Sequence, residues 1–550
     1  MAEFSCGDAT NLRLRNQKSS AAEPTQDRDS EKQFSRKSNE ASLCNIDRGS
    51  YWLTRIVILR YLGFIYSVAF LVAANQNKAL LGNNGLLPVS AFLKQVKEQA
   101  GGVNIKAITY VPSLLWLVKA EDIDFYLDLV AYIGFVLSSI VMITGAANVI
   151  TMATLWILYH SIVSVGQRWY SFGWESQLLE TGFLAIFLCP VLAWKCLPQE
   201  TPTSWSVIWG YRWLLFRIML GAVSRKTDTA FPQTQPVPSP FSYYLHQAPE
   251  VYHKFETLSN HFVELIVPWF TFLPRGFRIT CGVLQIVFQV ALIISGNLSF
   301  LNWLTILPSL AFFDDHTLSF MFSSKLGSIK WQIIKLQNKT KQGKLKTGKV
   351  RRITNLTLAL TVAYLSIPVV VNLMSPHQHM NTSFEPLRIV NTYGAFGSVT
   401  KKRTEVIFQG TYSEDPNDPD ASWEEYEFKC KPGNITRRPC LITPYHYRLD
   451  WLMWFSAFQN YQYNPWLVHL AAKLLVNDEE IMSLLAYNPF QRKMPPRFVR
   501  AEHYRYSYTK LGSRDSQRGH WWKRRYIGNY LPPVSLKTLS SVMKRFGWKI

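Results

Sequence analysis

Long apolar segments recur through the first two thirds of the chain and are separated by short polar stretches. The clearest is the run 353–376, which carries no charged residue and is long enough to cross the ~30 Å hydrocarbon core of a bilayer as one helix. Several other segments are shorter than the ~17 residues of a clean span, so the pattern predicts roughly five to nine crossings. The other candidate spans are Ile56–Ala74, Leu127–Ala147, Val149–Val165, Leu178–Trp194, Val207–Val223, Phe262–Leu273, Ile279–Ile294 and Phe300–Phe313.

After residue 376 the pattern changes to that of a soluble domain. Apolar residues alternate with polar ones in Arg403–Thr411 and Trp423–Lys431, and Tyr504, Tyr506 and Tyr508 repeat at period two, which predicts strands. Spacing near 3.6 predicts helices over Leu449–Phe458, Trp466–Val476 and Glu479–Tyr487, and Ser535 is placed to cap a last helix that ends at Phe546. The sequence therefore predicts a polytopic α-helical membrane protein with a C-terminal soluble α+β domain.

Charge orients the predicted membrane region. The segment 325–352 holds ten Lys and Arg residues and no Asp or Glu. Between 353 and 395 the sequence has just two charged residues, Glu385 and Arg388. Basic residues beside a span stay on the cytoplasmic side, so we expect this loop to be cytosolic and the tail to lie across the membrane. The loop also supplies much of the formal net charge of +22, which then requires no nucleic-acid partner.

The same reasoning divides the chain into five parts. Residues 1–51 contain eight basic and eight acidic residues and no apolar run, which is typical of a disordered segment rather than a cleaved signal peptide. We expect a disordered cytosolic head at 1–51, a helical multi-span region at 52–324, a basic cytosolic loop at 325–352, a last transmembrane helix at 353–376 and a lumenal α+β domain at 377–550.

Two features of the tail agree with a lumenal position. Asn381 and Asn434 each begin an N-glycosylation sequon, and Cys430 and Cys440 are close enough in sequence to form a small disulfide loop in an oxidising compartment. A third sequon, at Asn338, lies in the predicted cytosolic loop and should stay unmodified.

Familiar catalytic signatures fail on inspection. The segment 343–350 has the spacing of a phosphate-binding loop but ends in Val350, where a magnesium-binding hydroxyl is needed. The chain contains neither a His-Glu-x-x-His helix nor a Gly-x-Ser-x-Gly elbow. His446 and Asp450 would lie one helical turn apart, but no third metal ligand is evident near them. We therefore predict no enzyme activity, no cofactor and no metal site.

Two polar clusters within apolar surroundings are candidate functional residues, because ionisable groups are costly in a membrane. One contains Glu175 and Glu180, and the other contains Glu256, His261 and Glu264. Arg212 and Arg217 are plausible partners. Ion pairing that fixes helix packing is favoured over catalysis or ligand binding. The alternative is a membrane-embedded enzyme or carrier that uses these Glu and His side chains.

Tryptophans cluster near the ends of the apolar segments, where indole rings prefer the lipid headgroup region. This pattern predicts an interfacial belt. Its members are Trp52, Trp116, Trp169, Trp174, Trp194, Trp205 and Trp303.

Several long strings of residues resemble the lipase maturation factor family, and the resemblance extends from about residue 50 to the C-terminus. These strings are Trp52–Val57, Trp169–Phe183, Phe255–Phe262, Ser295–Trp303, Asn391–Gly397 and Pro444–Trp454. The chain departs from the family pattern in the segment 223–232, where the family has a longer lumenal segment containing two cysteines.

The resemblance implies a multi-pass endoplasmic-reticulum membrane protein. Such a protein would assist the folding and dimer assembly of newly made homodimeric secreted lipases: lipoprotein lipase, hepatic lipase and endothelial lipase. Membrane lipid and other endoplasmic-reticulum folding factors are further implied partners. Exposed aromatic residues of the lumenal domain would be candidate client contacts; these are Tyr504, Tyr506, Tyr508, Trp521 and Trp522.

Overall fold

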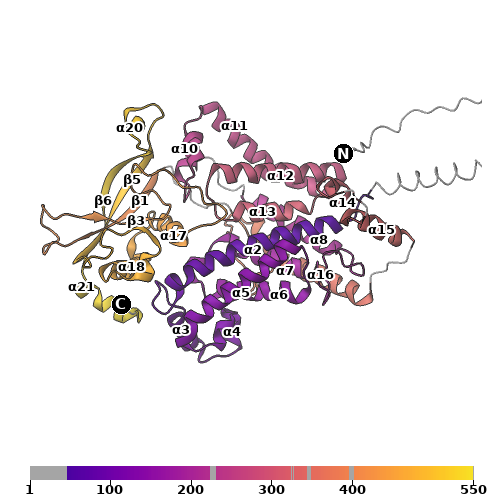
Figure 1. Ribbon diagram of the computed structural model, residues 1–550, viewed down its shortest axis with the longest axis horizontal. Helices are drawn as coiled ribbons and strands as arrows, with labels where there is room; N and C mark the ends of the chain where they lie inside the picture. The colour runs from indigo at the N-terminus through magenta and orange to yellow at the C-terminus, as the bar shows by residue number, and fades with distance from the viewer. Residues whose placement is uncertain are drawn as a thin grey trace, which may run out of the picture.

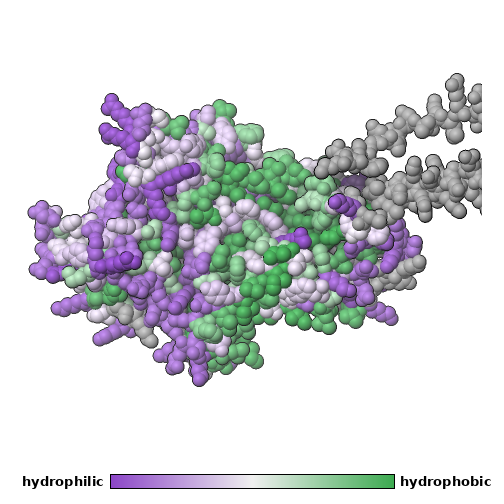
Figure 2. All heavy atoms as spheres, viewed as in Figure 1, coloured by the Kyte–Doolittle hydropathy of each residue, from purple (hydrophilic) through white to green (hydrophobic). Residues whose placement is uncertain are grey.

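The structure is a computed structural model that describes residues 46–222, 231–323, 325, 327–342, 348–394 and 402–548. A bundle of helices occupies one end of the molecule and a small β-domain the other (Figure 1). Figure 2 shows apolar surface over the helices and mainly hydrophilic surface over the β-domain. Most of the predicted head, and the divergent segment 223–230, lie outside the described residues.

Within the described ranges, four helical stretches are long and apolar enough to cross a membrane: Trp52–Leu81, Ala120–Thr144, Arg275–Ser295 and Lys349–Met374. These contain the helices α2 (Trp52–Leu81), α5 (Ile123–Thr144), α12 (Arg275–Ser295) and α16 (Lys349–Met374). Helix α2 is mostly buried and packs along α5, whereas α12 and α16 expose most of their apolar side chains. Together with the sheets described below, they confirm the predicted fold class.

Shorter helices complete the membrane body. They are α3 (Val89–Ala100), α4 (Ile105–Tyr110), α6 (Val149–Val165), α7 (Gly173–Ile186), α8 (Trp205–Ala222), α9 (Phe231–Thr234), α10 (Pro240–His246), α11 (Glu250–His261), α13 (Leu301–Leu310), α14 (Asp315–Leu318) and α15 (Ile329–Lys341).

Two predicted spans are not continuous α-helices. Helix α7 ends at Ile186, before Pro190, so the predicted span Leu178–Trp194 is wrong in its second half. The segment predicted as Phe262–Leu273 is a π-helical turn followed by a 3₁₀ helix that contains Pro268. Proline lacks the N–H that an α-helix requires and clashes with the preceding turn, which explains both interruptions.

The C-terminal domain is built on an antiparallel sheet in the order β2-β1-β5-β6. Strand β1 (Arg403–Thr411) pairs with β5 (Phe498–Tyr508) so that Arg403 lies opposite Tyr506. A second, two-stranded sheet is formed by β3 and β4. The remaining elements are β2 (Glu424–Glu425), β3 (Glu427–Phe428), β4 (Leu485–Tyr487), β6 (Trp522–Val534), α17 (Arg448–Ser456), α18 (Pro465–Leu475), α19 (Glu479–Met482), α20 (Arg514–Gln517) and α21 (Leu536–Phe546).

Most predicted elements of this domain are present. Strand β1 has the predicted bounds, and Ser535 caps α21 through a reciprocal capping box with Thr538. The helix predicted over Glu479–Tyr487 is wrong in its second half, because α19 ends at Met482 and residues from Leu485 pair with β3. The predicted strand Trp423–Lys431 is two short pieces, because β2 pairs with β1 whereas β3 pairs with β4 in the second sheet.

The predicted tryptophan belt is only partly correct. Trp194 and Trp205 are exposed, whereas Trp52, Trp169 and Trp174 are buried in the core. Trp169 packs edge-on against Trp466 of the C-terminal domain. Sequence periodicity cannot show such burial. Trp174 packs against Trp451 of the C-terminal domain, whereas Trp52 packs in a separate cluster with Phe313 and Ile333 of the helical body. One continuous apolar core therefore runs through both parts of the molecule.

Candidate functional site

A buried ion pair joins the membrane body to the C-terminal domain. Glu175 in the first turn of α7 accepts a hydrogen bond from Arg448 at the start of α17, with 2.7 Å between Nη1 and Oε1. Tyr159 and Trp174 also donate to this carboxylate. The Arg448 guanidinium lies over the Tyr170 ring, 3.5 Å from its centroid. Both charged groups are fully buried and paired, so the arrangement fixes the two domains relative to each other.

A second buried carboxylate, Glu180, holds the chain that follows α16. Its Oε1 pairs with Arg217 of α8. Its Oε2 accepts hydrogen bonds from the backbone N–H and the amide of Asn391, each at 3.1 Å, and from the Tyr393 hydroxyl at 2.7 Å. Arg217 is thus the partner that the sequence suggested. Arg212 instead donates to the Ala311 carbonyl and the Tyr51 hydroxyl.

The second predicted cluster does not join the first. Glu256 is exposed and lies 3.4 Å from His253, and His261 contacts the Thr257 carbonyl of its own helix at 2.7 Å. Only Glu264 is buried, and the Asn260 amide donates to it at 3.4 Å. Of the five predicted residues, Glu264 is the only one that lines the cavity described below.

His446 and Asp450 do not lie on one helix as expected, because α17 begins only at Arg448. The His446 ring bonds to Ser299 at 2.8 Å, and burial holds the pKa of the imidazole well below its usual 6.5. Asp450 accepts hydrogen bonds from the backbone N–H groups of Cys430 and Lys431. Burial outweighs these bonds and raises the pKa of the Asp450 carboxyl to about 6.

The disulfide loop docks on the membrane body. Cys430 and Cys440 are bonded to each other. The Asn297 amide donates to the Cys440 carbonyl at 2.7 Å and accepts from the Ile442 N–H at 3.0 Å. Asn434 is exposed on this loop, and Asn381 is exposed after α16. Both sequon asparagines are therefore exposed to solvent.

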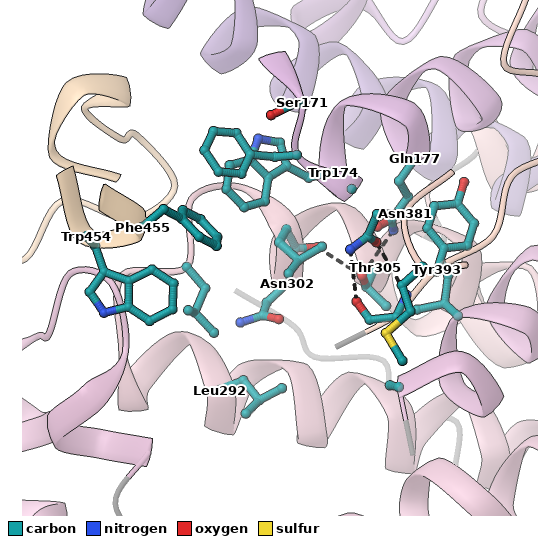
Figure 3. A pocket seen from close by; sticks show the side chains of 18 of the residues that line it. Ser171, Trp174, Gln177, Leu292, Asn302, Thr305, Asn381, Tyr393, Trp454 and Phe455 are labelled. Carbon is teal, nitrogen blue, oxygen red and sulfur yellow. Dashed lines mark hydrogen bonds between the residues drawn. The ribbon is translucent and has the colours of Figure 1, made fainter. Parts of the chain in front are cut away.

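A cavity of about 550 Å³ lies at the junction of the two domains. Figure 3 shows aromatic rings, among them Trp174, Trp454 and Phe455, on one side of it and polar side chains on another. The amide of Gln177 donates to Thr305 across this polar side at 3.1 Å. The polar lining residues are Arg168, Ser171, Gln177, Glu264, Gln289, Asn302, Thr305, Asn381, Tyr393, Gln459 and Asn464.

Sequence reasoning missed this cavity. Gln177 lies within the predicted polar cluster, between Glu175 and Glu180, but Asn302 is a single amide in an apolar segment, and no spacing rule brings α7 and α13 together. Arg448 was also missed as an ionic partner, although it lies within the string Pro444–Trp454 that carries the family resemblance. Among the residues that the structure describes, no group of three His, Cys, Asp or Glu side chains is arranged to hold a metal ion.

These features define a class of protein: a polytopic helical membrane protein whose C-terminal α+β domain is bound to the membrane body by buried polar contacts. Residues 53–320 match the lipase maturation factor transmembrane domain, and residues 389–532 match the lipase maturation factor C-terminal domain. The chain belongs to the lipase maturation factor family. This membership supports a role in lipase maturation.

The relatives agree over most of their length. Lipase maturation factor 1 of Mus musculus is 56% identical over 526 residues, which cover 92% of this chain and 92% of the relative. Lipase maturation factor 1 of Homo sapiens is 54% identical, with the same coverage of both chains. Lipase maturation factor 2 of Xenopus laevis is 26% identical and covers 91% of this chain and 85% of its own length. No solved structure matches the chain.

Proposed function

We propose that this protein is a non-enzymatic maturation factor of the endoplasmic-reticulum membrane. It assists the folding and dimer assembly of lipoprotein lipase, hepatic lipase and endothelial lipase, and their activity and secretion depend on it. The observation that carries the proposal is the 56% identity to a lipase maturation factor 1 along nearly the whole of both chains. Partly folded lipase chains expose apolar surface and unpaired strand edges, and shielding them favours assembly over aggregation.

The proposed orientation places the head (1–51) and the basic loop (325–352) in the cytosol and the domain 377–550 in the lumen. The charge of the loop beside α16 and the disulfide of the C-terminal domain support it. We propose that Asn381 and Asn434 carry glycans. In microsomes, glycosidase treatment should reduce the mass of the chain by the mass of two glycans. Each of the variants Asn381→Gln and Asn434→Gln should reduce this mass shift by one glycan. Modification at Asn338 instead would reverse the orientation.

Three of the five aromatic residues suggested as client contacts, Tyr506, Tyr508 and Trp522, are buried in the β-domain, whereas Tyr504 and Trp521 are partly exposed. Strand β6 lies at the edge of the four-stranded sheet and exposes about half of Tyr526 and Ile527. We propose that this edge receives an extended segment of the partly folded lipase, because an unpaired strand edge offers N–H and C=O groups to an incoming strand.

The direct test is complementation in cells that lack the endogenous factor. Expression of the full chain should restore secreted lipase activity without a change in lipase mRNA, and newly made lipase should co-purify with it. The variant Ile527→Pro should reduce co-purification, whereas Ile105→Pro, at an exposed residue of the membrane body, serves as the matched control. Unchanged lipase activity on expression of a normally abundant chain would overturn the proposal.

The alternative of a membrane-embedded enzyme or carrier has little geometric support. Glu175 and Glu180 are occupied by Arg448 and Arg217, and Glu256 is on the surface. The variants Glu256→Gln and Glu264→Gln separate the two ideas. We expect normal lipase maturation from both at normal protein levels.

A further inference from the structure

The cavity at the domain junction has the dimensions of a ligand site. Its volume of about 550 Å³ falls within the ~300–1,000 Å³ that is typical of small-molecule sites. Helices α7, α8, α12 and α13 of the membrane body line it together with α17 of the C-terminal domain. A bound molecule would therefore contact both parts of the protein at once (Figure 3).

Two buried amides of the lining have unused hydrogen-bonding atoms. Gln177 is fully buried and Asn302 is 4% exposed. Within the described part of the chain, Gln177 Oε1 and Asn302 Nδ2 have no hydrogen-bond partner. A buried amide atom left without a partner costs about 1–3 kcal/mol of stability. One acceptor and one donor on the cavity wall are the complement of a hydroxyl group, or of a hydroxyl next to an ester carbonyl.

The remaining lining indicates an apolar chain attached to an uncharged head. Trp174, Trp454 and Phe455 form an aromatic wall, and Ile218, Met219 and Leu292 add aliphatic surface. Among the described residues, the charged side chains of the lining are Arg168 and Glu264; Arg168 donates to Asn464 and Glu264 accepts from Asn260. An ionised head would meet one charge of each sign, already engaged, so a neutral polar head fits better.

The surroundings indicate where the ligand comes from. Helix α12 turns Gln289 and Leu292 toward the cavity, while Val283, Val287, Val290 and Ile294 on its other side are exposed apolar residues of a candidate span. A single helix thus lies between the cavity and this exposed apolar surface. The lining also contains Glu264, which lies in the π-helical turn Phe262–Ile266, a deviation that is frequent at functional sites.

From these observations we propose that the junction cavity binds a neutral single-chain lipid drawn from the surrounding bilayer. Gln177 Oε1 accepts from a hydroxyl of its head, and Asn302 Nδ2 donates to a hydroxyl or ester oxygen. Trp174, Trp454 and Phe455 pack against its acyl chain. The volume accommodates one chain rather than a two-chain phospholipid. The site is independent of the client-binding edge of β6, and a bound lipid would bridge the contact between the membrane body and the C-terminal domain.

The test uses the full chain purified in detergent and a monoacylglycerol that carries a photoactivatable diazirine and an alkyne tag on its acyl chain. Illumination should label peptides from α7, α12, α13 or α17. Excess untagged monoacylglycerol should compete for the site, whereas an equal excess of phosphatidylcholine should not. Labelling that maps outside the cavity lining, or that only phosphatidylcholine displaces, would overturn the proposal.

Two kinds of variant make the test specific. Leu292→Trp fills the cavity, while Val290→Trp places the same ring on the exposed side of α12 and is the matched control. Labelling should be lost in the first and retained in the second, with both proteins eluting as monodisperse peaks. Asn302→Leu should weaken apparent affinity about tenfold by removing one hydrogen bond to the head. Equal labelling of both Trp variants would show that the cavity is not a lipid site. Loss of lipase co-purification in Leu292→Trp with unchanged lipid labelling would show the same.

Discussion

At the scale of single residues, the buried carboxylates that the sequence singled out form ion pairs between separate elements of the fold. Glu175 and Glu180 lie on the same helix, five residues apart, and bind different partners: Arg448 from the C-terminal domain and Arg217 from α8. A buried ion pair is stable only when the geometry of its hydrogen bonds offsets the cost of removing both charges from water. Removal of one member leaves an uncompensated buried charge.

This asymmetry predicts the effect of Arg448→Leu. Because Glu175 would remain buried without its cation, the variant should lose about 3–5 kcal/mol of unfolding free energy. The midpoint of thermal unfolding of the detergent-solubilised protein measures the loss. Arg497→Leu is the control, since the Arg497–Glu414 pair is exposed to solvent and should contribute nothing measurable. Equal midpoints for the two variants would show that the buried pair is not a stabilising contact.

Asp450 should make stability depend on pH in the direction opposite to that of a salt-bridged carboxylate. Its folded-state pKa is about 6 against an ordinary 3.8, because burial disfavours the charged form. The folded state then binds more protons than the unfolded state between these values, so stability should fall as pH rises from about 4 to about 6 and stay level above. A tenfold difference in proton affinity between the two states corresponds to about 1.4 kcal/mol of stability.

The measurement is the unfolding midpoint of the purified full chain as a function of pH. The variant Asp450→Asn keeps an oxygen that can accept from the Cys430 and Lys431 N–H groups but does not titrate. It should therefore flatten the profile between pH 4 and 6. A wild-type profile that rises across this interval, or an identical profile for the variant, would contradict the assignment.

At the scale of elements, the helical body depends on close approaches at glycine. An added Cβ at Gly63 of α2 would lie 2.7 Å from the backbone nitrogen of Met142 on α5. Since backbone atoms cannot rotate away, Gly63→Ala should separate the two helices and cost about 1–3 kcal/mol. Gly276→Ala on α12 is the matched control, because nothing lies within 4 Å of its Cβ and alanine favours a helix. Thermal unfolding of both variants decides the point.

Sequence patterns correctly predicted the helices and strands that neighbouring residues determine. The capping box at Ser535 and the alternation over Arg403–Thr411 depend on neighbouring residues, and both elements have their predicted bounds. Strand β6 was missed because its exposed run from Lys523 to Ile527 does not alternate; pairing with β5 makes it a strand. Similarly, Leu485–Tyr487 becomes a strand through pairing with β3, against a helical periodicity. Long-range pairing overrides local preference in such places.

At the scale of the whole molecule, the sequence suggested two separable parts, and the structure shows a shared interior. The candidate site could be predicted only where its residues stand out as charges in apolar segments, as Glu175 and Glu180 do. The cavity could not, since it arises from the packing of α17 against the membrane body, with residues such as Leu292 and Trp454 far apart in the chain.

The C-terminal domain should therefore not fold stably when expressed alone as residues 377–548. Four of its buried side chains would lose partners in the membrane body: Arg448 binds Glu175, Arg403 donates to the Gln233 carbonyl, Trp454 donates to the Thr234 carbonyl at 2.9 Å, and His469 contacts the Leu86 carbonyl at 2.8 Å. Arg403 would keep its ion pair with Glu405, but the apolar core that the domain shares with the membrane body would be exposed to water. Loss of this burial removes the main favourable contribution to folding, and a typical domain has only ~5–15 kcal/mol of stability to lose.

Size-exclusion chromatography and limited proteolysis of the fragment measure this outcome. We expect aggregation or rapid digestion, and recovery of a protease-resistant complex when residues 1–376 are co-expressed in the same membrane. The same co-expression with Glu175→Leu in the membrane part should recover less complex, because Arg448 would then be buried without its anion. A monomeric, protease-resistant fragment that binds newly made lipase would show instead that the C-terminal domain folds and acts independently of the membrane body.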